Sequence, residues 1–252
     1  MTLPVLVSIP HGGDQTPPEI ADRVRLRPAN RFDDADACTR DIYDVSAEAA
    51  RLESFEVARA FVDVNRAPDD RPPANRDGVV KTATAYGVPV YHEGRELTDD
   101  LVETLLDRYY RPYHERLAAA AKTPGLRLAL DCHSMAAAPP PMVPDAGRER
   151  PLFCLSNDGG RTCPAETLER LAAALAEAFE CRRDEVWLNR PFRGGYITRH
   201  HGGGALPWAQ VEMNRSLYLA APWFDRERLL VAPDRLAELG GRFLDALRRL
   251  DL

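Results

Sequence analysis

The chain has 252 residues, 44% of them hydrophobic and 29% charged, which is typical of a globular protein long enough to bury a core. Its formal net charge is -6 and no block of Lys and Arg stands out, so the composition argues against a nucleic-acid surface. No apolar run approaches the ~20 residues that a bilayer span requires, and no basic segment opens the chain. We therefore expect a cytoplasmic protein without membrane contact.

The predicted strands are short, and several are apolar on both faces, as in a sheet that is covered on each side. They occupy residues 5–9, 57–64, 126–132, 152–155, 186–188 and 209–213.

Helical patterns lie between these strands. They cover residues 39–52, 98–121 with a kink or break at Pro112, a segment that begins near Pro164, and residues 233–250. The alternation predicts an α/β fold with three αβα layers and a mainly parallel or mixed sheet. Because no repeat or linker divides the sequence, we expect a single domain over residues 1–252.

Three irregular segments follow predicted strands, at residues 66–80, 136–151 and 190–206. Loops in these places form the ligand sites of α/β folds, and we expect them to line a pocket unless they are simple solvated connections.

Two histidines follow apolar strands. His11 comes after the first strand, and His133 comes after Asp131, a carboxylate that would either orient its ring or face the pocket itself. Two histidines at neighbouring strand ends can share one metal ion, which then needs a carboxylate and an open position. The five cysteines show no C-x-x-C spacing, so any metal site would use histidine and carboxylate ligands. The candidate carboxylates are Asp14, Asp34 and Asp36.

Asn65 and Arg66 end an apolar segment side by side. They would suit an acidic substrate, because arginine binds a carboxylate through two bonds, or Arg66 would tie down the loop that follows. Glu212 interrupts a buried strand and is either a general base or the partner of an arginine such as Arg215.

A glycine-flanked segment supplies Arg193 and Tyr196, which could bind an oxyanion or a substrate carboxylate. His200 is a further candidate in this segment, whereas His114 is predicted to be a packed histidine. No serine-hydrolase elbow, nucleotide-binding loop or dinucleotide fingerprint is present.

Six motifs, in order along nearly the whole chain, resemble the N-formylglutamate amidohydrolase family. They are SIPHGG at residues 8–13, DADACTRDIY at 34–43, VDVNR at 62–66, DCHS at 131–134, GGYIT at 194–198 and VEMNRSLY at 211–218. The resemblance implies a phosphorylase/hydrolase-like fold of the zinc exopeptidase kind and one zinc ion per chain. Other divalent metals would also suit such a site.

Carried onto this chain, the resemblance implies that His11 and His133 are metal ligands and that Glu212 is the general base. Asp36 is the preferred third ligand, because family members often carry Thr at the position of Asp14. Asn65 and Arg66 would bind the substrate carboxylate, and Arg193 or Tyr196 would help to hold the oxyanion. The implied reaction converts N-formyl-L-glutamate, a small anionic N-acyl amino acid, to formate and L-glutamate, a step of histidine catabolism.

Two departures from the family pattern affect the substrate prediction. The chain has no H-x-x-E motif, and Ala37-Cys38 replaces the Trp-His pair found in formylglutamate hydrolases of histidine breakdown. Alternative functions are a metallo-carboxypeptidase or amidase acting on a peptide or cell-wall fragment, and a binding protein without turnover. The oligomeric state is not predicted by the sequence.

Overall fold

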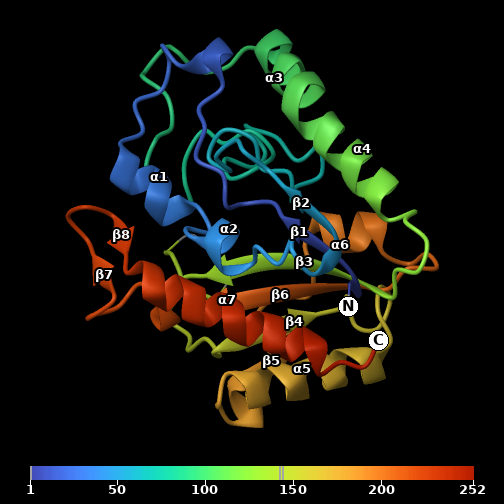
Figure 1. Cartoon of the computed structure of the whole chain (residues 1–252). Coiled ribbons are helices and arrows are strands. Elements are labelled where there is room, and N and C mark those ends of the chain that lie inside the picture. Colours follow the sequence, from blue (N-terminus) through green and yellow to red (C-terminus); the bar gives the residue numbers. More distant parts are fainter. Residues whose placement is uncertain (1, 142, 144) are drawn as a thin grey trace.

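The computed structural model describes residues 2–141, 143 and 145–252 (Figure 1). The strands are β1 (Leu3–Ile9), β2 (Ala49–Ser54), β3 (Leu128–Met135), β4 (Phe153–Ser156), β5 (Val186–Leu188), β6 (Trp208–Asn214), β7 (Phe224–Asp225) and β8 (Leu230–Val231). The α-helices are α1 (Pro28–Asp34), α2 (Thr39–Ile42), α3 (Asp99–Leu105), α4 (Arg111–Ala120), α5 (Ala165–Ala178), α6 (Tyr196–His201) and α7 (Pro233–Arg248).

The core of the fold is a six-stranded sheet in the order β2-β1-β3-β6-β4-β5. Strands β2, β1, β3 and β6 run parallel to one another, β4 runs antiparallel to β6, and β5 is parallel to β4. The sheet is therefore mixed and mostly parallel, which confirms the predicted fold class. The carboxyl ends of β1 and β3 lie next to each other at one edge of the sheet, where α/β folds place their sites.

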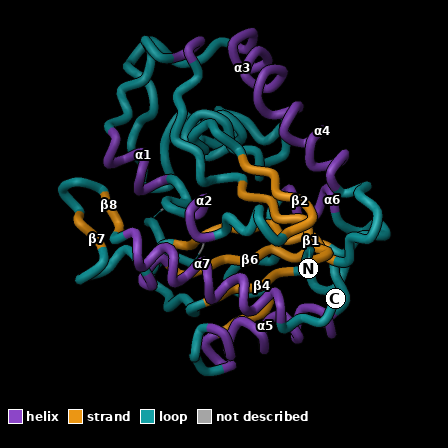
Figure 2. The backbone as a smooth tube through the Cα atoms, in the orientation of Figure 1, coloured by secondary structure: helices purple, strands orange, loops and turns teal. Residues whose placement is uncertain are grey.

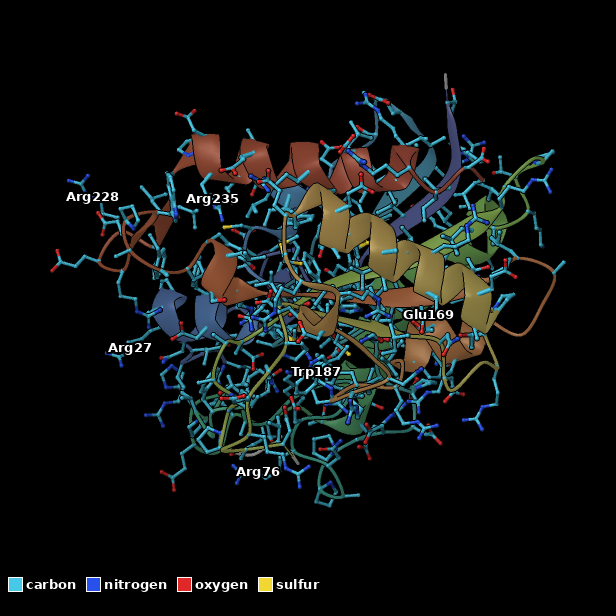
Figure 3. All side chains as sticks on the ribbon, turned by 90° about the horizontal axis from the view of Figure 1, so that it is seen from below. Arg27, Arg76, Glu169, Trp187, Arg228 and Arg235 are labelled. Atoms are coloured by element: carbon cyan, nitrogen blue, oxygen red, sulfur yellow. The ribbon has the colours of Figure 1, made fainter. Side chains whose placement is uncertain are left out.

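Both faces of the sheet are covered. Helices α2, α5 and α7 pack on one face, and Figure 3 shows α5 and α7 side by side over the strands. The other face is covered by α3, α4 and α6 and by a long irregular segment between β2 and α3, drawn as loop in Figure 2. This second face carries the polar residues of the site. None of the helices that the structure describes is both long and apolar enough to cross a membrane.

Alternation along β3 separates core residues from site residues. Leu130 and Cys132 point into the core beneath α5 and α7, and Asp131 and His133 occupy the intervening positions. Strand β6 repeats the pattern, and its register places Glu212 opposite His133. The sheet therefore holds polar groups of two strands next to each other on one face.

Two predicted elements are wrong. The helix predicted over 39–52 ends at Ile42, and Ala49–Ser54 forms the edge strand β2, which pairs with β1. The strand predicted over 57–64 is a series of turns, apart from a single bridge between Val57 and Gln15. This segment is nevertheless almost wholly buried. An apolar run reports burial and does not by itself distinguish a strand from a buried loop.

The other helix predictions agree with the structure. Helix α5 begins directly after Pro164 and buries Leu168, Leu171 and Leu175, as its apolar spacing predicts. In the predicted 98–121 helix, residues Leu106–Tyr110 wind as a π-helix just before Pro112. A proline lacks the N–H that continues the α-helical ladder, so a change of winding occurs where the kink was expected. The predicted 190–206 loop contains the short helix α6, and Met142 and Pro144 of the 136–151 loop lie outside the described residues.

Candidate metal centre and its pocket

Three segments of the chain meet in a buried cluster of two histidines and an aspartate. His11 lies just beyond the end of β1, His133 lies on β3, and Asp36 follows α1. The Nδ1 atom of His133 is 3.1 Å from Nδ1 of His11 and 3.0 Å from Oδ2 of Asp36, and His11 Nδ1 is 3.4 Å from the same oxygen. Each residue thus directs one donor atom at a common point.

This cluster fits a divalent transition metal. Two imidazole nitrogens and a carboxylate oxygen are ligands that zinc accepts, and all three residues are buried. Tetrahedral ligands about 2.05 Å from zinc lie about 3.3 Å from one another, close to the separations found between these three atoms. Three protein ligands leave a position open, as in catalytic zinc sites.

Both histidines are oriented by a carboxylate on the other side of the ring. His11 Nε2 is 2.7 Å from Asp63 Oδ1, and His133 Nε2 is 3.1 Å from Asp131 Oδ1. Since a carboxylate accepts hydrogen bonds, the network assigns the ring N–H of each histidine to Nε2 and leaves the Nδ1 lone pair for a metal.

The local charges favour ionised carboxylates in the cluster. Burial alone would raise the pKa of Asp36, but His11, His133 and Arg59 outweigh it and hold that pKa well below its ordinary value. Burial likewise opposes ionisation of Asp63, and Arg59 and His11 hold its pKa well below the usual range. Burial would lower the pKa of His133, yet its carboxylate neighbours raise it well above the ordinary value. The protein environment therefore favours positive charge at the cluster.

Glu212 faces the cluster from β6, where it is directly opposite His133 in the sheet register. Its Oε1 accepts a hydrogen bond from Gln210 Nε2 at 2.8 Å, and burial raises the pKa of its carboxyl to about 7. Among the pocket-lining carboxylates that the structure describes, Glu212 alone forms no ion pair. The alternative prediction of a bond to Arg215 is wrong, because Arg215 binds Asp36 instead.

Asn65 and Arg66 line the same pocket. Asn65 Oδ1 accepts a hydrogen bond from the Ile197 amide at 2.8 Å, and its Nδ2 lies 3.2 Å from His133 Nε2. Arg66 donates from Nη2 to Asp77 at 2.9 Å, with just over a third of its side chain exposed. Arg66 thus holds the following loop, as one of the two predicted alternatives requires, while it also lines the pocket.

Arg193 and Tyr196 approach the pocket from the segment that leads into α6. Arg193 is exposed, lies against Gly159 and forms no ion pair with any residue that the structure describes. Tyr196 is half-buried, and its ring stacks on His200 with centroids 4.8 Å apart. Both residues are therefore at the rim rather than beside the two histidines of the cluster.

The pocket has a volume of about 570 Å³. All eight predicted site residues line it, which are His11, Asp36, Asn65, Arg66, His133, Arg193, Tyr196 and Glu212. Each of the three predicted loops contributes to the wall, which confirms that they form a pocket. The volume lies within the range of small-molecule sites.

Three lesser candidates do not join the cluster. Asp14 is exposed and does not line the pocket, and Asp34 is bound to Lys81 at 3.0 Å. His200 is exposed on α6. His114 is packed as predicted, with its Nε2 donating to the carbonyl of Val64 at 3.0 Å.

Sequence reasoning gave no role to several polar residues around the cluster. Arg59, Asp63 and Lys81 form buried or half-buried ion pairs there, and Arg199 and Gln210 also line the pocket. The available signal was the presence of Arg59 and Asp63 inside an otherwise apolar run, since charges in such a run need partners.

Comparisons with known proteins agree with the geometry. The model of the N-formylglutamate amidohydrolase family matches residues 3–219. The N-formylglutamate deformylase of Pseudomonas putida is 29% identical over 238 residues, which are 90% of this chain and 86% of the relative. The enzyme of the same name from Pseudomonas aeruginosa is 31% identical over 207 residues, which are 79% of this chain and 75% of the relative.

Two solved structures share the fold. The crystal structure of N-formylglutamate amidohydrolase from Ralstonia eutropha superposes with a TM-score of 0.80 at 22% identity, covering 99% of this chain and 94% of the other. A gene product of Agrobacterium tumefaciens superposes with a TM-score of 0.64 at 16% identity, covering 98% and 90%.

Proposed function

This chain belongs to the N-formylglutamate amidohydrolase family and is therefore an amide hydrolase, and on that premise we propose that it cleaves a small N-acyl amino acid, most simply N-formyl-L-glutamate, with a divalent metal. The observation that carries the proposal is the convergence of His11, Asp36 and His133 on one point, with Glu212 opposite in the same pocket. Relatives at 29% and 31% identity are named N-formylglutamate deformylases, which supports this substrate.

His11, Asp36 and His133 would hold the metal, with zinc as the first candidate. When bound, such an ion polarises a carbonyl and lowers the pKa of a water molecule. The protein then has to place the substrate and move protons. The donor set would also accept cobalt, manganese or iron, so zinc is a proposal to be tested.

Glu212 is the proposed general base. Its carboxylate has no cation bound to it among the described residues, so it is available to take a proton from the attacking water. Water attacks the formyl carbon, the C–N bond breaks, and Glu212 returns the proton to the leaving amine. The products are formate and L-glutamate.

Asn65 and Arg66 are the proposed carboxylate-binding residues. The Nδ2 group of Asn65 lies at the metal end of the pocket, and Arg66 keeps over a third of its side chain exposed although it binds Asp77. Arg193 and Tyr196, at the rim, are proposed to bond to the developing oxyanion or to a second carboxylate after the substrate enters.

The test is to measure metal content and formate release from N-formyl-L-glutamate before and after treatment with a chelator. About one metal ion per chain with chelator-sensitive formate release is the expected result. Metal binding without formate release would refute N-formyl-L-glutamate and direct the search to other N-acyl amino acids or peptides. Absence of any bound divalent metal would refute the metal-dependent mechanism.

A further inference from the structure

The two oxygens of Asp36 have different partners. Oδ2 faces the two histidines and also accepts the backbone N–H of Ser134 at 3.2 Å. Oδ1 accepts hydrogen bonds from two guanidinium groups, from Arg59 Nη1 at 3.2 Å and from Arg215 Nη2 at 3.0 Å. The carboxylate is therefore held with one oxygen toward the proposed metal position and the other turned toward cations.

Arg215 is itself fixed on several sides. Its Nε donates to Ser134 Oγ, its Nη2 to the carbonyl of Ser134, and its Nη1 to the carbonyl of Asp33, each at 3.0 Å. With the bond to Asp36, these contacts use four of the five N–H groups of the side chain. The residue is buried, directly follows β6, and contacts the end of β3, the last turn of α1 and the segment after α1. Because these contacts fix the guanidinium group of Arg215 on several sides, it cannot easily move away from the Asp36 carboxylate.

Arg59 connects the same carboxylate to the residue that orients His11. While its Nη1 holds Asp36, its Nη2 donates to Asp63 Oδ2 at 2.9 Å, and the other oxygen of Asp63 binds His11 Nε2. The guanidinium of Arg59 therefore fixes the spacing between the proposed ligand Asp36 and Asp63, the carboxylate that orients the proposed ligand His11. The planar geometry of arginine is suited to this task, and a lysine has a single nitrogen for it.

We infer that Arg215 and Arg59 are positioning residues that clamp Oδ1 of Asp36, so that this aspartate offers a metal ion only Oδ2. This inference rests on the metal site of the proposed function. A carboxylate with both oxygens free can bind a metal through two bonds and occupy a position that the reaction needs open. The clamp removes the second oxygen, and its two cations also offset the negative charge that surrounds the cluster.

The experiment compares the purified full-length protein with Arg215→Lys and Arg59→Lys, each loaded with cobalt as a spectroscopic probe. Arg235→Lys is the matched control. Arg235, at the start of α7 (Figure 3), donates to the carbonyl of Leu217 and binds Glu238, but touches no proposed ligand. Affinity is measured by competition with a chelator, and the visible cobalt bands report the coordination number.

Roughly 10- to 100-fold weaker cobalt binding is expected for Arg215→Lys and Arg59→Lys, as for other residues that orient metal ligands. The visible bands should also weaken, because a second oxygen of Asp36 raises the coordination number. Arg235→Lys should match the wild type in both measurements. If one lysine variant does not fold, the other still tests the same clamp.

Wild-type affinity and unchanged visible bands in the lysine variants would overturn the inference and leave the proposed function standing. Weaker affinity with unchanged bands would also overturn it, because the arginines would then act without constraining the second oxygen. If the wild type binds cobalt but releases no formate, the proposed substrate fails and the clamp is still tested. A wild type that binds no metal would overturn both proposals.

Discussion

Replacing His114 with Gln should weaken the dependence of folding stability on pH. His114 Nε2 donates to the carbonyl of Val64, so in the neutral ring Nδ1 must accept, and the partner 3.0 Å away is Nε2 of His201. Burial and the neighbouring His201 and His200 lower the pKa of His114 from 6.5 to about 3, although the hydrogen bond to Val64 and the charge of Asp131 oppose the effect. The native state therefore keeps this imidazole neutral well below the pH at which the unfolded chain protonates it.

The sign and size of the effect follow from proton linkage. Because the pKa is lower in the native state, the unfolded state binds more protons as the pH falls below about 6.5, and stability decreases in that direction. Between pH 7 and pH 5 the loss from this one histidine is about 2 kcal/mol, and it levels off only near the native pKa of about 3.

The assay is urea unfolding at pH 7 and pH 5 for the wild type, His114→Gln, and His92→Gln as a control at an exposed histidine. Glutamine can still donate to Val64 but cannot be protonated, so the difference in unfolding free energy between the two pH values should shrink by about 2 kcal/mol in His114→Gln. His92→Gln should retain the wild-type difference. Equal pH dependence in His114→Gln and the wild type would refute the reasoning.

Three further changes test other parts of the structure. Glu212→Gln should lower turnover by about 100- to 10,000-fold with metal content unchanged, and normal turnover would remove Glu212 from the base role. Lys81→Met leaves the buried Asp34, 3.0 Å from the lysine nitrogen, without its ion-pair partner and removes one of the two cations that bind Asp77, so it should cost about 3–5 kcal/mol in urea unfolding; an unchanged midpoint would contradict this. A Cβ at Gly195 would overlap the side-chain amide of Asn65, so Gly195→Ala should raise KM, whereas Gly204→Ala, with open space around it, should not. Equal KM values for the two alanine variants would exclude this role of the close contact.

The parts of the site that lie on strands could be predicted from the sequence. In β3 the apolar residues Leu130 and Cys132 alternate with Asp131 and His133, and a strand of period two must send the two sets to opposite faces. Glu212 on β6 followed from the same alternation. Because parallel strands end at one edge of the sheet, His11 and His133 could be expected to meet before any distance was known.

The parts that depend on tertiary contacts could not be predicted in this way. Residues 49–52 are Ala, Ala, Arg and Leu, which favour a helix, but pairing with β1 makes them an edge strand. In the buried segment 57–64, the environment of Asp63 is set by Arg59, four residues away, and by His11, far away in sequence. No local pattern encodes the second of these contacts, so the role of Asp63 in orienting His11 could not be predicted, whereas Asp131, two residues before His133 on the same strand, could be.

Local pairing also explains how a chain of net charge -6 could accept the proposed anionic substrate. The aspartates that line the pocket are bound to arginine, lysine or histidine, so their charge is largely offset where a substrate would approach. Arg193 and Arg199, at the rim, form no ion pair with any described residue. The acidic side chains outside the pocket act on a ligand through solvent, which screens their charge beyond about 10 Å. Arg193 and Arg199 are therefore the cations that an entering anion can reach at the rim, and a divalent ion in the cluster would add positive charge deeper in the pocket. The sign of the local field, rather than that of the whole chain, determines which ligand the pocket attracts.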